Sequence, residues 1–160
     1  MIAGYPRTLT IIAAVGAGVS GGVFFAFSTF VMKALGRLPN AEAISAMKAI
    51  NKSAPSPLFM LALFGTGAVS IALSVVALRH LDQSWAAYVL VASALYVVAI
   101  TLTMAYHVPH NDALALVDPS SPSAARAWAQ YYSPWTAWNH VRTITALAGC
   151  TTFILALRTG

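Results

Sequence analysis

The stretch WTAWNHVRTITALAGC, residues 135–150, begins with polar and aromatic side chains and ends as an apolar run. The apolar part, residues 143–157, holds 15 residues. At about 1.5 Å per residue it would be about 22 Å long, whereas a helix needs roughly 20 residues to cross a hydrocarbon core. A membrane-crossing helix here must therefore include the polar segment before it. Ser133 as N-cap and Pro134 as first helical residue predict a helix from Pro134 to about Leu157. This helix carries Asn139, His140 and Arg142 into the membrane.

The composition of the whole chain indicates a membrane protein. Of the 160 residues 59% are hydrophobic and 8% are charged, and the mean hydropathy is +0.74. Soluble domains carry about a quarter charged residues. Three further runs, residues 8–32, 57–78 and 83–106, contain no charge and are long enough to cross the bilayer. The sequence predicts an all-α integral membrane four-helix bundle in one domain, 1–160, with spans at about 8–34, 57–79, 83–107 and 134–157.

The connections between these spans are unequal in length. Residues 79–82 form a tight turn, whereas residues 36–56 and 107–133 are longer and emerge on the same side. Apolar residues at helical spacing predict short surface helices in loops one and three, at about 40–51 and 124–132. A functional site is expected on this side of the bundle.

The remaining composition narrows the classes of partner. The net charge of +5 comes from residues at helix ends and in loops, as is usual in membrane proteins, so nucleic acid is not expected as a partner. The single cysteine, Cys150, is expected to pack as a small hydrophobe. Membrane lipid is an expected partner, and the glycine-rich face of helix one, Gly18 and Gly22, could pack within the chain or in a homo-oligomer. That face continues toward the loop-one side through Thr29.

Polar side chains cluster on one face of the last two spans. At about 100° per residue, Trp135, Trp138, Asn139 and Arg142 share a face of the last helix, whereas His140 points about 140° from Trp135. On the third span one side is lined by Tyr96, Thr103 and His107.

Pro109 is expected to end or kink the third span. The segment YHVPHND, residues 106–112, then becomes a helix end at the mouth of the bundle. It leads His107, His110 and Asn111 toward the polar start of the last helix.

Three functions remain open on these residues. A metal or haem could be held by His107, His110 and His140, because helix bundles bind such groups between facing helices. Arg142 and the aromatic residues could instead face the headgroups of a non-catalytic protein that binds a lipid or a partner. The third function is an enzyme, which would need only a base, a group that stabilises an anion and an aromatic-lined pocket. An amide and a guanidinium within a span are costly unless they are paired or used.

Two motifs, VPHNDALALVDP at residues 108–119 and WTAWNHVRT at residues 135–143, resemble those of the anthrone-oxygenase-like family of small four-helix membrane proteins. Helix one, GGVFFAFSTFVMKAL at residues 21–35, is similar more loosely. The resemblance spans nearly the whole chain. It implies that the shared polar positions are Asn111, Trp138, Asn139, His140 and Arg142.

The resemblance also marks two departures. His107 stands where the family is expected to have asparagine, and His110 where an aliphatic residue is usual. They could adapt the pocket to another substrate, or form a metal or haem site that the relatives lack.

The activity implied by the resemblance is oxidation of a flat apolar phenolic, anthrone- or hydroquinone-like substrate by O2, without a cofactor. The partners would be this small aromatic substrate and O2, in a multi-pass protein of a bacterial inner membrane. The catalytic base would be His140, or His107 in its place, and Arg142 would stabilise the oxyanion. Asn139 would be the third catalytic residue and would orient the substrate. The substrate would be bound by Asn111, His107, Trp135, Trp138, Tyr96 and Thr29.

Overall fold

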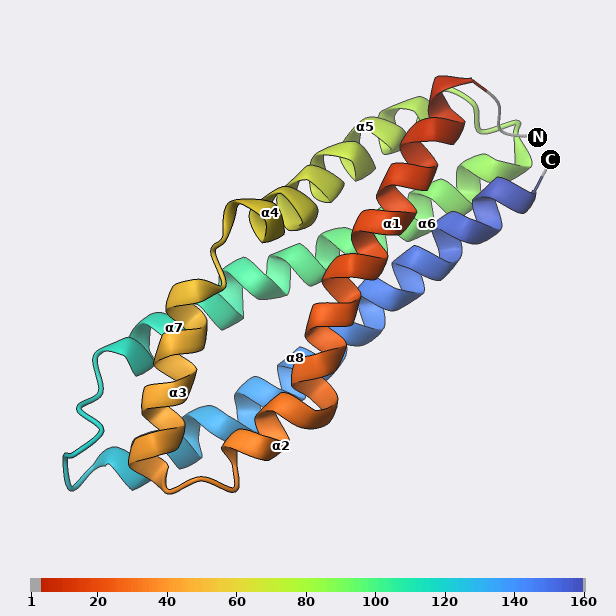
Figure 1. Ribbon diagram of the computed structural model, residues 1–160. Helices are drawn as coiled ribbons and strands as arrows, with labels where there is room; N and C mark the ends of the chain where they lie inside the picture. Colours follow the sequence, from red (N-terminus) through yellow and green to blue (C-terminus); the bar gives the residue numbers. More distant parts are fainter. Residues whose placement is uncertain (1–3, 160) are drawn as a thin grey trace.

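The computed structural model describes residues 4–159, and all its regular elements are helices. Four long helical rods lie antiparallel (Figure 1), and each is long and apolar enough to cross a membrane. The rods are Tyr5–Leu35, Pro57–Leu78, Ser84–Ala115 and Ala124–Arg158. The predicted all-α membrane four-helix bundle is confirmed.

Three of the four rods contain a five-residue π-helical segment. The first rod consists of α1 (Tyr5–Ala26), η1 (Phe27–Val31) and α2 (Met32–Leu35). The second consists of α4 (Pro57–Met60), η2 (Leu61–Gly65) and α5 (Thr66–Leu78), and the third of α6 (Ser84–Leu102), η3 (Thr103–His107) and α7 (Val108–Ala115). The fourth rod is α8 (Ala124–Arg158), and α3 (Asn40–Ser53) connects the first two rods. The π segments all lie toward the end of the bundle that carries α3 (Figure 1).

Helix α8 is the centre of the bundle, because α1 and α6 both pack along it, while α5 packs on α6 and less extensively on α1. Small residues allow the close approach. A Cβ added at Gly149 of α8 would lie 3.1 Å from the carbonyl oxygen of Ala92 in α6. Close backbone packing of this kind replaces the hydrophobic drive that is missing inside a bilayer.

Apolar side chains on the outside of the rods are exposed, among them Val15, Leu61, Ile71, Val91 and Ile144. In a soluble protein such a surface would be costly, whereas in a bilayer it contacts lipid chains. The chain is therefore an integral membrane protein.

The helix in loop one, predicted at 40–51, is present as α3 and packs on α7 and α8. Its buried Ile44 and Met47 form an apolar cluster with Leu114, Trp128 and Tyr131, and this cluster closes the end of the bundle that carries α3. In loop three the amide and hydroxyl of Ser120 donate hydrogen bonds to Asp118, and these bonds lower the pKa of that carboxyl.

Two predicted helix ends were wrong. The last helix does not begin at Pro134, because α8 starts at Ala124 and includes the segment expected as a separate helix. Burial of Trp128 and Tyr131 against α3 outweighs the hydrogen bond that Pro134 cannot donate. The third rod also continues past Pro109, the second residue of α7, where the preceding π segment η3 has already altered the backbone hydrogen-bond ladder.

We expect Gly149→Val to destabilise the bundle by about 1–3 kcal/mol, because the added methyl groups would meet backbone atoms of α6 that cannot swing aside. The matched control is Gly22→Val, since a Cβ at Gly22 meets nothing within 4 Å. Thermal unfolding in detergent micelles measures the difference. Equal midpoints for the two variants would contradict the close packing of α6 on α8.

Candidate functional site

Arg142 is a cation buried in the middle of the bundle, with 6% of its surface exposed. Its Nε and Nη2 donate hydrogen bonds to Oδ1 of Asn139 over 3.2 and 2.6 Å, and its Nη1 donates to Oγ1 of Thr103 over 3.4 Å. Its Cζ lies 4.0 Å from the ring centroid of Phe24 and 5.5 Å from that of Trp135, so two aromatic faces also stabilise the charge. All of these partners of Arg142 are neutral side chains.

Asn139 holds this guanidinium in place. Its Nδ2 donates to the carbonyl oxygen of Phe24 over 2.9 Å and to Oγ of Ser28 over 2.7 Å, which ties α8 to α1 and η1. The hydroxyls of Ser28 and Thr143 are 2.9 Å apart and complete the network. Both amide hydrogens and the amide oxygen of Asn139 are thus engaged, so this side chain positions Arg142 and has no donor left for a ligand.

His107 is buried, and its two ring nitrogens have different surroundings. Nδ1 lies 3.0 Å from the carbonyl oxygen of Leu102, five residues earlier, and a carbonyl can only accept, so Nδ1 carries the proton. Nε2 is buried without a hydrogen-bond partner within the described residues. The ring meets the indole of Trp135 edge to face, with 4.9 Å between centroids. With the proton on Nδ1, a neutral His107 has its lone pair on Nε2, which is the form that a general base requires.

Asn111 connects α7 to α8. Its Oδ1 accepts hydrogen bonds from the hydroxyl of Tyr131 over 2.7 Å and from Nε1 of Trp135 over 2.9 Å. Because the oxygen is used by these two donors, the amide nitrogen is the group that Asn111 can offer to a ligand.

Arg142, His107 and Asn111 line one pocket of about 630 Å³. This volume lies within the range of roughly 300–1,000 Å³ that is typical of small-molecule sites. Apolar walls come from α1, α4, η2 and η3: Phe24, Phe59, Met60, Leu63, Phe64 and Met104. The loop-side rim carries charges: Lys48, Lys52 and Asp112.

The structure brings together five of the residues expected at the site. His107, Asn111 and Arg142 line the pocket. Asn139 contacts Arg142, and Trp135 contacts all three of the lining residues.

Four expected site residues lie elsewhere. His140 is exposed on the outer face of α8, as its angle from Trp135 indicated. Trp138 is 43% exposed and packs on Tyr106, and Thr29 is exposed and donates to a carbonyl of its own helix. Tyr96 is fully buried among apolar side chains, with its hydroxyl near Ser20 and the carbonyl of Leu63.

The three histidines considered as metal or haem ligands do not face a common point. His107 is buried, His140 is exposed, and His110 stacks on Tyr106 with 3.9 Å between ring centroids. Over residues 4–159 no three His, Cys, Asp or Glu side chains gather where they could hold a metal ion.

Sequence reasoning missed several members of the site. Phe24 and Phe59 give no signal in an apolar run, because a wall residue cannot be distinguished from a lipid-facing one. Ser28 could have been recognised as a polar residue within a span. Asn51, at the end of α3, lines the pocket with a buried amide nitrogen that has no partner among the described residues.

We expect Asn139→Leu to destabilise the protein by about 1–3 kcal/mol, since it breaks the bonds to α1 and leaves the guanidinium without its main acceptor. Thr29→Val is the control, because that hydroxyl bonds only within its own helix. Chemical unfolding in micelles measures both. A loss for Asn139→Leu no larger than that of the control would show that the network does not hold the helices together.

Comparison with known proteins bears on this arrangement. No curated protein and no solved structure matches the chain. The sequence model of the family described as Anthrone oxygenase matches residues 58–152, which run from α4 into the second half of α8 and contain His107, Asn111, Asn139 and Arg142. This match covers more than half of the chain and confirms the resemblance of the two motifs. The chain belongs to the anthrone oxygenase family.

Proposed function

We propose that the protein is a membrane-embedded oxygenase that oxidises a flat, apolar phenolic, anthrone- or hydroquinone-like substrate with O2. Membership of the family supports an oxygenase-like role in general. The observation that carries the more specific proposal is Arg142, a buried cation with neutral partners on the wall of a largely apolar pocket. A charge in that position is costly unless an anion is bound or formed beside it.

The pocket suits a substrate that is apolar in body and acidic at one position. A guanidinium has five N–H donors, of which three are engaged by Asn139 and Thr103, so two remain for a ligand oxygen. The aromatic rings of Phe24 and Phe59 provide flat apolar walls in place of Trp138, which faces outward.

In the proposed reaction His107 acts as the base, the alternative to His140 that the geometry favours. Nε2 of His107 takes a proton from the methylene carbon of an anthrone, and the negative charge moves to the carbonyl oxygen, where Arg142 stabilises it. The resulting anthranolate passes one electron to O2, and the carbon radical and superoxide combine to form a C–O bond. After protonation the hydroperoxide loses water and becomes a carbonyl, so anthrone and O2 give anthraquinone and H2O.

The proposal assigns no cofactor, because the anionic substrate is itself the electron donor. The protein's contribution is to bind the neutral molecule, remove a proton and hold the anion away from water. An amide nitrogen of Asn111 at the pocket wall is proposed to orient the substrate, and Asn139 to keep Arg142 in place.

We expect Arg142→Met to lower kcat/KM for an anthrone by about 10²–10³-fold, because the developing oxyanion loses its stabilising charge. His107→Gln is expected to lower kcat by about 10²–10⁴-fold through loss of the base. Oxygen uptake and anthraquinone absorbance measure both, after subtraction of the rate of spontaneous oxidation.

The matched control is His140→Gln, which changes an exposed histidine outside the pocket and should leave the rate unchanged. The mechanism would be refuted if both Arg142→Met and His107→Gln kept the wild-type rate, and the assignment of the base would be refuted if only His140→Gln lost it.

A further inference from the structure

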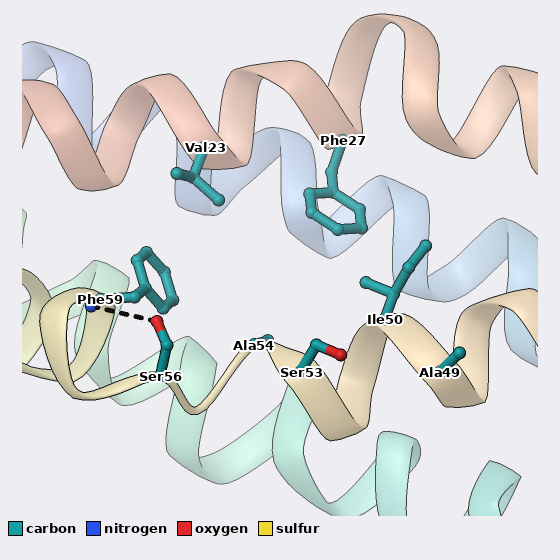
Figure 2. A pocket seen from close by; sticks show the side chains of 8 residues that line it. All are labelled: Val23, Phe27, Ala49, Ile50, Ser53, Ala54, Ser56 and Phe59. Atoms are coloured by element: carbon teal, nitrogen blue, oxygen red, sulfur yellow. Dashed lines mark hydrogen bonds between the residues drawn. The ribbon is translucent and has the colours of Figure 1, made fainter.

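Phe59 borders three separate hollows of the protein. It lines the pocket that contains Arg142, and also a hollow of about 520 Å³ between α1 and the link from α3 to α4. Figure 2 shows its ring extending from the start of α4 toward Val23 of α1, beside this second hollow. The third hollow is a groove of about 820 Å³ that runs along α1 and the α4–α5 rod.

The groove opens to the hydrocarbon phase. Exposed apolar side chains of two membrane-crossing rods line it: Ile11, Ile12, Val15, Val19, Leu58 and Leu61. It follows the seam between α1 and α5, where packing is less extensive than where α1 meets α8. Lipid chains, or a molecule dissolved among them, therefore have direct access to one side of Phe59.

The other side of Phe59 leads to the buried cation. The rings of Phe59 and Phe24 meet edge to face, with 6.4 Å between centroids and 87° between planes. The ring of Phe24 in turn lies against the guanidinium of Arg142. Phe59 thus lines both the groove and the polar pocket, and Phe24 connects it to the guanidinium.

The position of Phe59 in its helix allows this side chain to move without disturbing the bundle. It lies in the first turn of α4, directly after the non-helical link at Ala54–Ser56, and Oγ of Ser56 accepts a hydrogen bond from its amide over 3.4 Å. The side chain is half-buried and has only two torsions, so rotation needs no change in the packing of α5 against α6.

We propose that the substrate enters the Arg142 pocket from the hydrocarbon phase through the groove between α1 and the α4–α5 rod, and that Phe59 is the gate. This proposal rests on the proposed function, because the substrate proposed there is a neutral, flat, apolar molecule, and such a molecule is concentrated in lipid. The loop-side rim of the pocket, with Lys48, Lys52 and Asp112, is the opposite opening, and we expect it to admit polar species. The two openings separate an apolar route from a polar one.

The test places a thiol inside the pocket and asks which reagent reaches it. Thr103→Cys in a Cys150→Ser background, in lipid nanodiscs, is labelled either with an apolar maleimide dissolved in the lipid or with a charged, membrane-impermeant methanethiosulfonate added to the water. We expect Phe59→Ala to raise the rate of labelling by the apolar maleimide severalfold and Phe59→Trp to lower it. The rate with the charged reagent should stay unchanged in both.

The matched control is Phe64, which lines the same pocket but not the groove, so Phe64→Ala and Phe64→Trp should not separate the two reagents. Leu63→Cys, at a buried wall position, repeats the measurement if Thr103→Cys does not fold.

The gate would be overturned if the Phe59 variants left labelling by the apolar maleimide unchanged, or changed both reagents equally, as general loosening would. Labelling needs no turnover and no substrate. An inactive protein with gated labelling would refute only the proposed reaction, and an active protein with ungated labelling only the gate.

Discussion

The structure depends on one buried contact, the hydrogen bonds from the guanidinium of Arg142 to the amide oxygen of Asn139. A cation inside a bilayer needs stabilising partners, and here an amide, a hydroxyl and two aromatic rings provide them in place of a carboxylate, with two N–H donors left unused. Because the same amide donates to Phe24 and Ser28, the group that holds the charge also joins α8 to the first rod. The contact between the rods and the position of the buried cation thus depend on one network.

The π segments explain how polar groups meet in a bundle of nearly straight rods. In a π turn the backbone contains one extra residue, so side chains after it face a different direction than a regular helix would give them. Ser28, Leu63, Thr103 and His107 all lie in such segments, and each contributes to the network or the pocket. The bond from Nδ1 of His107 to a carbonyl five residues earlier follows from the π geometry, and it leaves Nε2 as the free nitrogen.

Much of the fold could be predicted from the sequence. Uncharged runs and low charge predict the spans, because backbone hydrogen bonds inside lipid can be satisfied only within helices or closed barrels. The helix ends predicted at Pro134 and Pro109 were wrong. The tendency of proline to end a helix is outweighed at Pro134 by aromatic side chains buried against α3, and at Pro109 a π turn precedes the proline. Helical spacing also placed Tyr96 at the site, although it is buried among apolar neighbours.

The sequence by itself determined that the chain crosses the membrane four times and that Asn139 and Arg142 lie within the last span, because hydropathy and helical spacing are local properties. Helical spacing indicated that His140 points away from Arg142, but only the tertiary structure decided that His107, on another rod, shares a pocket with Arg142. It also placed Phe24 and Phe59 at the pocket wall, which no local pattern marks. Pocket walls are formed by side chains from different rods, and their meeting depends on how the rods pack.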